Sequence, residues 1–274
     1  MNPESLVRQF ARIGARLEIE VSSDVQGRNA ASNYSLDIKE EGRNEFYLLE
    51  VAKPAIETIE FQVLNTQRDL RHLVLMARNE AAPLASNKQK FLCGHDERHW
   101  FVAALPVAAA VTDVKTAMEA LKPREAVWSQ RRNAVPAKQL NLRHNAGFIR
   151  QGEWFFVPEP GFSVWALDVV RKHEPISRGA GSKPHIVAEL VRRGGELVYV
   201  NRRTRTTLTA LQFENRVRSG KIKNPAEWVD QRMTTEVFVR GTVRHADHKT
   251  IELKGWHRVA MNAEPNSNNV RFLD

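Results

Sequence analysis

Residues 90–105 carry the pattern that most limits how this chain can fold. Two apolar runs, FLCG and HWFVAAL, stand on either side of polar residues near 95–98. Neighbouring side chains of a strand point to opposite faces of its sheet, so both faces of these two strands would be apolar. We therefore expect a β-hairpin that is central in a sheet and covered on each side. With residues 95–98 as its loop, Gly94 would face His99 and Phe91 would face Val102.

The rest of the first half shows short elements of both kinds. Helical spacing of apolar residues predicts a helix near residues 4–14, and a second helix is expected after Thr112 as its N-cap. Alternation or apolar runs predict strands at residues 17–21, 46–51, 58–64 and 72–77. This mixture predicts an α+β fold with mixed, mostly antiparallel sheets and several short helices.

The second half has clear start and stop signals for helices. Pro184 suits the first position of a helix that would end at Gly194 and Gly195. Thr209 and Gln212 form a capping box for a second helix, which Gly220 would end. The motif NPAE at residues 224–227 predicts a third helix reaching about Met233.

The last strong pattern is a hairpin whose register can be derived. A loop of residues 246–248 pairs Val243 with Ile251 and Gly241 with Leu253. One face of the hairpin then becomes consistently apolar, which a two-residue turn would not allow.

The element order over residues 184–260 is helix, strand, helix, helix, strand, loop, strand. In this order alone, the segment resembles a winged-helix DNA-binding domain. The resemblance implies a recognition helix at residues 224–233. In that segment, however, Glu227 and Asp230 would repel the DNA phosphates, and Arg232 is the single cation that would attract them. The alternative is an ordinary α+β domain in which two capped helices pack on a sheet.

Charge is distributed unequally along the 274 residues. The chain has 41 basic and 32 acidic side chains, a net charge of +9. Residues 1–137 hold 18 of each sign, so the whole excess lies in residues 138–274. We therefore expect a balanced α+β domain at residues 1–130, a basic linker at 131–152 and a basic α+β domain with a terminal β-hairpin at 153–274. A localised excess of this kind is typical of proteins that bind a polyanion, most often nucleic acid.

Clusters of arginine and lysine identify the residues expected to contact nucleic acid. The densest cluster lies in NRRTRTT, and others lie in the linker, before Pro184, after the capped helix and at the terminal hairpin. The candidates are Arg131, Arg132, Arg178, Lys183, Arg202, Arg203, Arg205, Arg216, Arg218, Lys221, Lys223, Arg244 and Lys249. Lys183 and Arg178 would bring phosphate to the start of the helix at Pro184, where free amides favour anions.

Histidine and aspartate at the terminal hairpin suggest a catalytic or metal-binding site. His245, Asp247 and His248 have the side-chain types of a general acid–base site or of metal ligands. A second polar tip contains His95, Asp96, Glu97 and His99. A divalent metal would need both tips together, because one tight loop rarely aims three side chains at one point. Polar hairpin tips without chemistry are the simpler interpretation, so we expect no cofactor, with a divalent metal as the alternative.

The resulting hypothesis is a nucleic-acid-binding protein of the cytoplasm that contacts the phosphate backbone of DNA or RNA through its basic C-terminal half. Cys93 is the only cysteine, which suits a reducing compartment. No apolar run reaches the length of a membrane span, so no membrane partner is expected. Two alternatives stay open: a nuclease or other nucleic-acid-processing enzyme that uses the hairpin-tip residues, and an assembly protein with an acidic protein partner.

Overall fold

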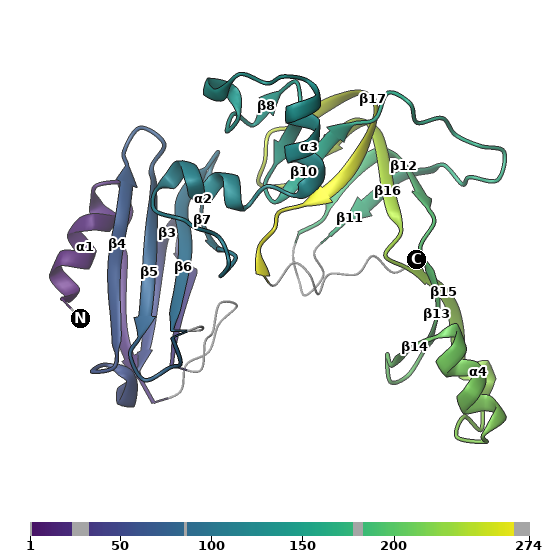
Figure 1. Ribbon diagram of the computed structural model, residues 1–274, viewed down its shortest axis with the longest axis horizontal. Helices are drawn as coiled ribbons and strands as arrows, with labels where there is room; N and C mark the ends of the chain where they lie inside the picture. Colours follow the sequence, from purple (N-terminus) through teal and green to yellow (C-terminus); the bar gives the residue numbers. More distant parts are fainter. Residues whose placement is uncertain (1, 24–32, 85–86, 178–182, 266–274) are drawn as a thin grey trace. The chain divides into compact units, whose positions relative to one another are not determined.

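Sheets dominate the fold. A computed structural model describes residues 2–23, 33–84, 87–177 and 183–265 (Figure 1). These residues form seventeen β-strands, four α-helices and three short 3-10 helices. The expected balanced α+β class is therefore wrong, and the chain is a mostly β protein.

The chain forms two compact units. The first contains the residues up to Phe155, together with Asp247–Lys249 and the segment that begins at Met261. The second contains Phe156–Ala246 and Thr250–Ala260. Residues 131–152, expected as a linker, lie within the first unit.

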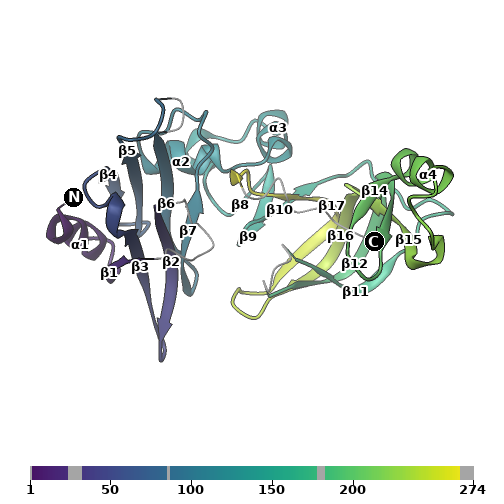
Figure 2. The ribbon, with the colours of Figure 1, turned by 90° about the horizontal axis from the view of Figure 1, so that it is seen from below.

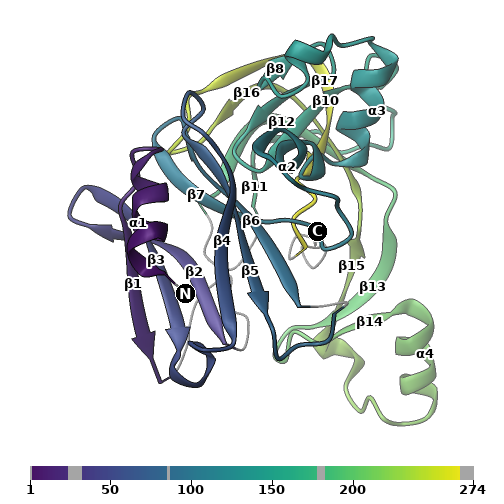
Figure 3. The same ribbon diagram turned by 60° about the vertical axis from the view of Figure 1, so that its left-hand side comes forward.

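The first unit contains two sheets that share a core. Strands β1 (Leu17–Ser22), β2 (Tyr34–Glu41) and β3 (Asn44–Ala52) form one sheet in the order β1-β3-β2, with β1 parallel to β3. Strands β4 (Ile59–Gln67), β5 (His72–Asn79), β6 (Lys88–Asp96) and β7 (His99–Ala104) form an antiparallel sheet in chain order, and η1 (Lys53–Ala55) precedes it. Their shared core includes Leu6 and Phe10 of helix α1 (Pro3–Ala11), which is visible beside the strands in Figure 3.

A second core covers the other face of the β4–β7 sheet. Helix α2 (Val114–Ala120) places Val114 and Ala117 against Val74 and Leu92. Asp113, and not Thr112, is the N-cap, and it forms a capping box with Thr116. The expectation that β6 and β7 are covered on both faces is thus confirmed.

The detailed geometry of that hairpin differs from the expectation. Asp96 pairs with His99, so the turn has two residues and not four. Gly94 consequently faces Phe101, and Phe91 faces Ala104. Glu97 adopts a φ of +54°, a left-handed conformation that a two-residue turn requires and that the sequence disfavours. β7 is also an edge strand of its sheet and not a central one.

The remainder of the first unit follows α2. It comprises helix α3 (Arg124–Arg132), η2 (Ala137–Gln139), β8 (His144–Asn145) and β9 (Phe148–Gln151), and it ends within β10 (Trp154–Pro158). Strands β8 and β9 pair as an antiparallel hairpin.

The second unit is built from long antiparallel strands (Figure 2). Its strands are β11 (Arg171–Ile176), β12 (His185–Arg193), β13 (Glu196–Asn201), β14 (Thr207–Thr209), β15 (Trp228–Met233), β16 (Glu236–Arg244) and β17 (Ile251–Met261). One sheet has the order β11-β12-β16-β17-β10, and a smaller one has the order β14-β13-β15. Helix α4 (Ala210–Arg218) and η3 (Pro225–Glu227) connect β14 to β15.

Two of the three expected helices of the second half are strands. The segment after Pro184 is β12, which pairs with β11 on one side and β16 on the other. A register shift between Val187 and Glu189 breaks its alternation, so its buried residues are unevenly spaced and imitate a helix. The segment 224–233 is one 3-10 turn followed by β15, since pairing with β13 outweighs local helix signals. The winged-helix resemblance is therefore wrong.

Two other predictions for this half are confirmed. Helix α4 begins after Thr209, whose capping box with Gln212 is present. In the terminal hairpin, Val243 pairs with Ile251 and Gly241 with Leu253. Among the described residues, none of the helices has the length and apolar character needed to cross a membrane.

Candidate nucleic-acid interface

A long antiparallel pairing of strands within these two sheets, here called the ribbon, organises the basic part of the second unit. β12 continues into β13 through Gly194 and Gly195, while β15 continues into β16 through Thr234 and Thr235. The pairing extends from Ile186 opposite Arg244 to Asn201 opposite Trp228. At about 3.3 Å per residue, this ribbon is roughly 50 Å long.

The ribbon is interrupted where its two glycines lie. Gly194 and Gly195 have φ values of +71° and +84°, which favour glycine. A Cβ on Gly195 would lie 2.7 Å from Thr235 Cγ2 and 2.9 Å from the Met233 carbonyl oxygen. Any larger residue would therefore force the two strands apart at this point.

Residues 202–223, here called the tip segment, connect the far ends of the ribbon strands. They contain seven basic residues and one acidic residue, Glu214. All seven cations are exposed. They are Arg202, Arg203, Arg205, Arg216, Arg218, Lys221 and Lys223.

A tight turn holds the first three arginines. The Asn201 side chain accepts hydrogen bonds from the amides of Arg203 and Thr204, at 3.0 and 2.9 Å. The Arg205 amide donates to the Asn201 carbonyl at 2.9 Å, and Arg205 has a φ of +58°. Because buried Asn201 fixes the backbone, the three guanidinium groups project from a defined turn.

Helix α4 and the residues that follow it carry the remaining four cations. Its Phe213 ring stacks on Tyr199 of β13, with centroids 3.9 Å apart, and lies 5.6 Å from Trp228 of β15. Arg216 and Arg218 lie in the last turn, where cations interact favourably with the helix dipole. Lys221 and Lys223 follow directly after the helix.

The cations of the tip segment differ in their ion pairing from those nearer the base of the ribbon. Within the described part of the chain, no ion pair joins any of its seven cations to a carboxylate. Arg192, Arg193 and Arg240 nearer the base of the ribbon do form such pairs, with Glu174, Asp168 and Glu189. The positive potential of the ribbon is therefore concentrated at its tip.

Comparisons with known proteins add no relationship. No protein-family model, no curated protein and no solved structure matches the chain.

The other predicted contact residues are spread over both units. Arg131 and Arg132 are exposed in the last turn of α3 in the first unit. Arg244 ends β16 and is exposed, and exposed Lys183 has its carbonyl oxygen 3.2 Å from His245 Nε2. Arg178 lies outside the described residues. The helix expected to begin at Pro184 is wrong, because Pro184 precedes strand β12, while phosphate contact by Lys183 stays a prediction.

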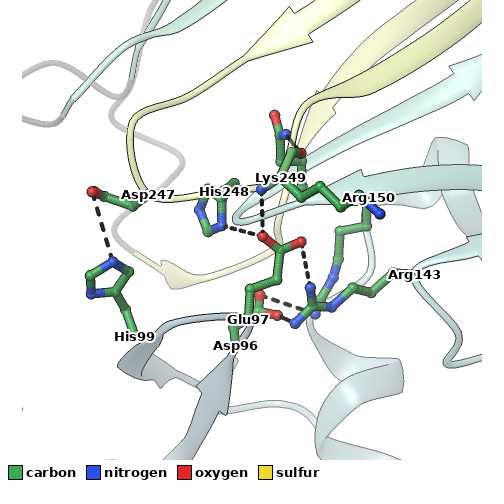
Figure 4. A network of polar contacts seen from close by, with 9 residues as sticks. Asp96, Glu97, His99, Arg143, Arg150, Asp247, His248 and Lys249 are labelled. Carbon is green, nitrogen blue, oxygen red and sulfur yellow. Dashed lines mark hydrogen bonds and ion pairs between the residues drawn. The ribbon is translucent and has the colours of Figure 1, made fainter.

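The first unit does bring the two polar hairpin tips together (Figure 4). Glu97 pairs with Arg143 at 2.6 Å, accepts a hydrogen bond from the Lys249 amide at 2.8 Å and lies 3.5 Å from His248 Nδ1. Asp96 pairs with Arg143 and with Arg150, the latter at 3.3 Å. Burial lowers the pKa of Arg150, and it lowers that of Arg143 to about 10.

His99 is enclosed by carboxylates in the same network. Its Nδ1 lies 2.5 Å from Glu45, and its Nε2 lies 3.8 Å from Asp247. The predicted catalytic residues Asp247 and His248 thus lie beside His99 and Glu97, whereas His245 belongs to the second unit, where its ring stacks on His185 at 4.1 Å. A catalytic or metal-binding role of these three residues stays a prediction.

Sequence reasoning missed the two most exposed tryptophans. Trp154 is fully buried, and Trp256 packs against Phe162 and Arg240. Trp128 and Trp165 are instead 75% and 62% exposed. The arginines at positions four residues before and after Trp128 were the available signal, because they place it on a charged helix face.

Trp165 belongs to an ordered apolar loop at residues 161–170. The Arg193 guanidinium lies 4.3 Å from the Phe162 ring and 3.9 Å from the Trp165 ring, and it pairs with Asp168. Asp168 also accepts a hydrogen bond from the Trp165 amide at 2.7 Å. The loop is held in this way although Leu167 is 96% exposed.

Proposed function

We propose that this protein binds the sugar–phosphate backbone of nucleic acid through the tip segment of its β-ribbon. One observation carries the proposal: seven exposed cations lie within 22 residues, and no carboxylate of the described chain neutralises them. Lys and Arg that approach phosphates release condensed counterions, which is the main favourable term in such binding.

The chemistry of the tip segment favours backbone contact over base readout. Its cations come from a turn, from the end of a short helix and from the residues after that helix. They are therefore not aligned along one face of a helix, as they would be in a helix that enters a groove of DNA. Five of the seven are arginines, whose planar guanidinium matches a phosphate with two hydrogen bonds. Such contacts position a protein on nucleic acid without specifying sequence.

The proposal includes DNA or RNA as partner and the cytoplasm as location. The single cysteine, Cys93, is a buried free thiol, as suits a reducing compartment. An acidic protein could bind the same cations, so the experiment must distinguish such a protein from nucleic acid.

The experiment measures binding of the full chain to labelled single- and double-stranded DNA and RNA at ~50 mM salt. A variant with all seven tip cations replaced by glutamine should lose binding. The matched control removes seven exposed cations of the first unit. They are Arg12, Lys39, Arg43, Lys53, Arg68, Lys88 and Lys115. Absence of binding by the unmodified protein, or equal losses in both variants, would overturn the proposal.

A further inference from the structure

Helix α3 of the first unit has an exposed face with an unusual composition. Trp128 lies at its centre and is 75% exposed. Arg124 and Arg132 lie four residues before and after it, so the three side chains are neighbours on the helix surface. Arg131, three residues after Trp128, is exposed on the same face. The large aromatic ring is therefore flanked by cations on both sides.

The orientation of this helix is fixed by its opposite face. Ala126, Ser129 and Gln130 are buried. Gln130 donates to the Leu140 carbonyl at 2.7 Å and accepts from Lys122 at 3.2 Å. A Cβ on Gly147 would lie 2.5 Å from Gln130 Cγ, so the chain packs closely there. Trp128 is thus held outward by a well-packed helix.

The charge of this surface matches an anionic partner. Within the described residues, none of Arg124, Arg131 and Arg132 forms an ion pair. Glu125 is the one acidic residue of the helix, and no acidic residue follows until Glu153. An apolar protein partner would have to bury three unpaired guanidinium groups, which is costly. An anionic partner with a flat ring could stack on the exposed indole and also pair with the arginines.

We propose that α3 binds single-stranded nucleic acid, with an unpaired base stacked on the Trp128 indole and adjacent phosphates on the flanking arginines. This inference rests on the proposed function and names its substrate class. In a duplex, the faces of the bases are covered by their neighbours, so an indole on a convex helix has no base to stack on. In a single strand each base offers a face, and stacking on an aromatic side chain is tolerant of sequence.

The test uses three probes of equal length with the full chain: oligo-dT, an abasic deoxyribose-phosphate oligomer and duplex DNA. Base stacking contributes about 1–3 kcal/mol, so Trp128→Ala should weaken oligo-dT binding by roughly 5- to 150-fold. Trp128→Phe should restore most of that affinity, because phenylalanine also stacks. Affinity for the abasic oligomer should not change in either variant. Circular dichroism of each variant checks that it is folded.

Several results would overturn the inference. Unchanged oligo-dT binding in Trp128→Ala would do so, as would an equal loss on the abasic oligomer, which would indicate a contribution without stacking. Binding of poly-glutamate that depends on Trp128, without such dependence for oligo-dT, would indicate an acidic protein partner instead. Loss of all nucleic-acid binding on neutralising the tip segment, with Trp128→Ala unaltered, would retain the proposed function and reject only this inference.

Discussion

Tyr199 and Phe213 stack with their ring planes 10° apart and their centroids separated by 3.9 Å. The first residue lies on β13 of the ribbon, and the second lies on α4 of the tip segment. This stacking joins the helix that carries Arg216 and Arg218 to the ribbon. The positions of these two tip cations therefore depend on one aromatic pair.

Replacing Phe213 by alanine should release α4. Isolated helices shorter than about 12 residues are marginal in water, and α4 has nine, so packing must stabilise it. We expect amide hydrogen exchange in residues 210–218 to accelerate about tenfold, with weaker nucleic-acid binding. Leu211→Ala is the matched control, because Leu211 lies on the same helix and is 67% exposed. Equal exchange in both variants would contradict this role of the stack.

Replacing Arg193 by methionine should open the apolar loop at residues 161–170. The variant removes the ion pair with Asp168 and the hydrogen bond to the Ser163 carbonyl at 2.9 Å. The Arg193 guanidinium lowers the pKa of Asp168, which places the two charges in direct interaction. Limited proteolysis should then cleave near Leu167 faster than in the unmodified chain. Asp168→Asn should show a smaller effect, and unchanged cleavage in both variants would refute the assignment.

The Glu97→Gln variant tests the network in Figure 4. It removes the ion pair with Arg143 while keeping an oxygen to accept from the Lys249 amide. Because the network is partly buried, we expect a loss of about 1–2 kcal/mol in the free energy of unfolding. Glu40→Gln, at an exposed carboxylate, should change the unfolding free energy by less than about 0.5 kcal/mol. Denaturant titration measures both, and equal values would rule out a stabilising role for Glu97.

His72 should make stability depend on pH. Burial lowers its pKa to about 4, and the neighbouring charges of Arg150 and Arg143 act in the same direction. The unfolded chain, with a histidine pKa near 6.5, therefore binds the proton more readily between these values. The contribution of His72 to the free energy of unfolding is therefore complete above pH ~6.5. It is lost as the pH falls towards 4, by about 3 kcal/mol in total.

Unfolding free energies of the unmodified chain and of His72→Gln, measured from pH 7.5 to pH 4, check this. The variant should show a shallower loss of stability through that window. His144→Gln, at an exposed histidine, should follow the unmodified chain. Parallel curves for His72→Gln and the unmodified chain would disprove the assignment.

Local signals were sufficient for some elements and insufficient for others. The capping box of Thr209 and Gln212 was identified correctly because it depends on four consecutive residues. The register of the terminal hairpin followed from the pattern of apolar residues on one face. The helix-start signals at Pro184 and Asn224 gave wrong predictions. Each precedes a strand, and the partners of that strand are distant in the sequence. Only tertiary pairing decides such cases.

The basic residues of the candidate interface could be predicted from the sequence, but their location in the fold could not. The basic cluster at residues 202–223 is visible in the sequence, whereas its location at the end of a ribbon depends on the pairing of β13 with β15. The proximity of Glu97 to Lys249 likewise joins residues 152 positions apart. Periodicity carries no information about such distances.

The salt dependence of binding tests the central claim most directly. Each phosphate that a substituted side chain no longer neutralises should reduce the slope of log K against log salt by about 0.7 for a single strand and 0.9 for a duplex. Replacing Arg202, Arg203 and Arg205 by glutamine should therefore reduce the slope by about 2 to 3. The same change at Arg43, Lys53 and Arg68, exposed cations of the first unit, should leave the slope unaltered. Equal slopes for the tip variant and the unmodified protein would contradict the assignment of nucleic-acid binding to the tip segment.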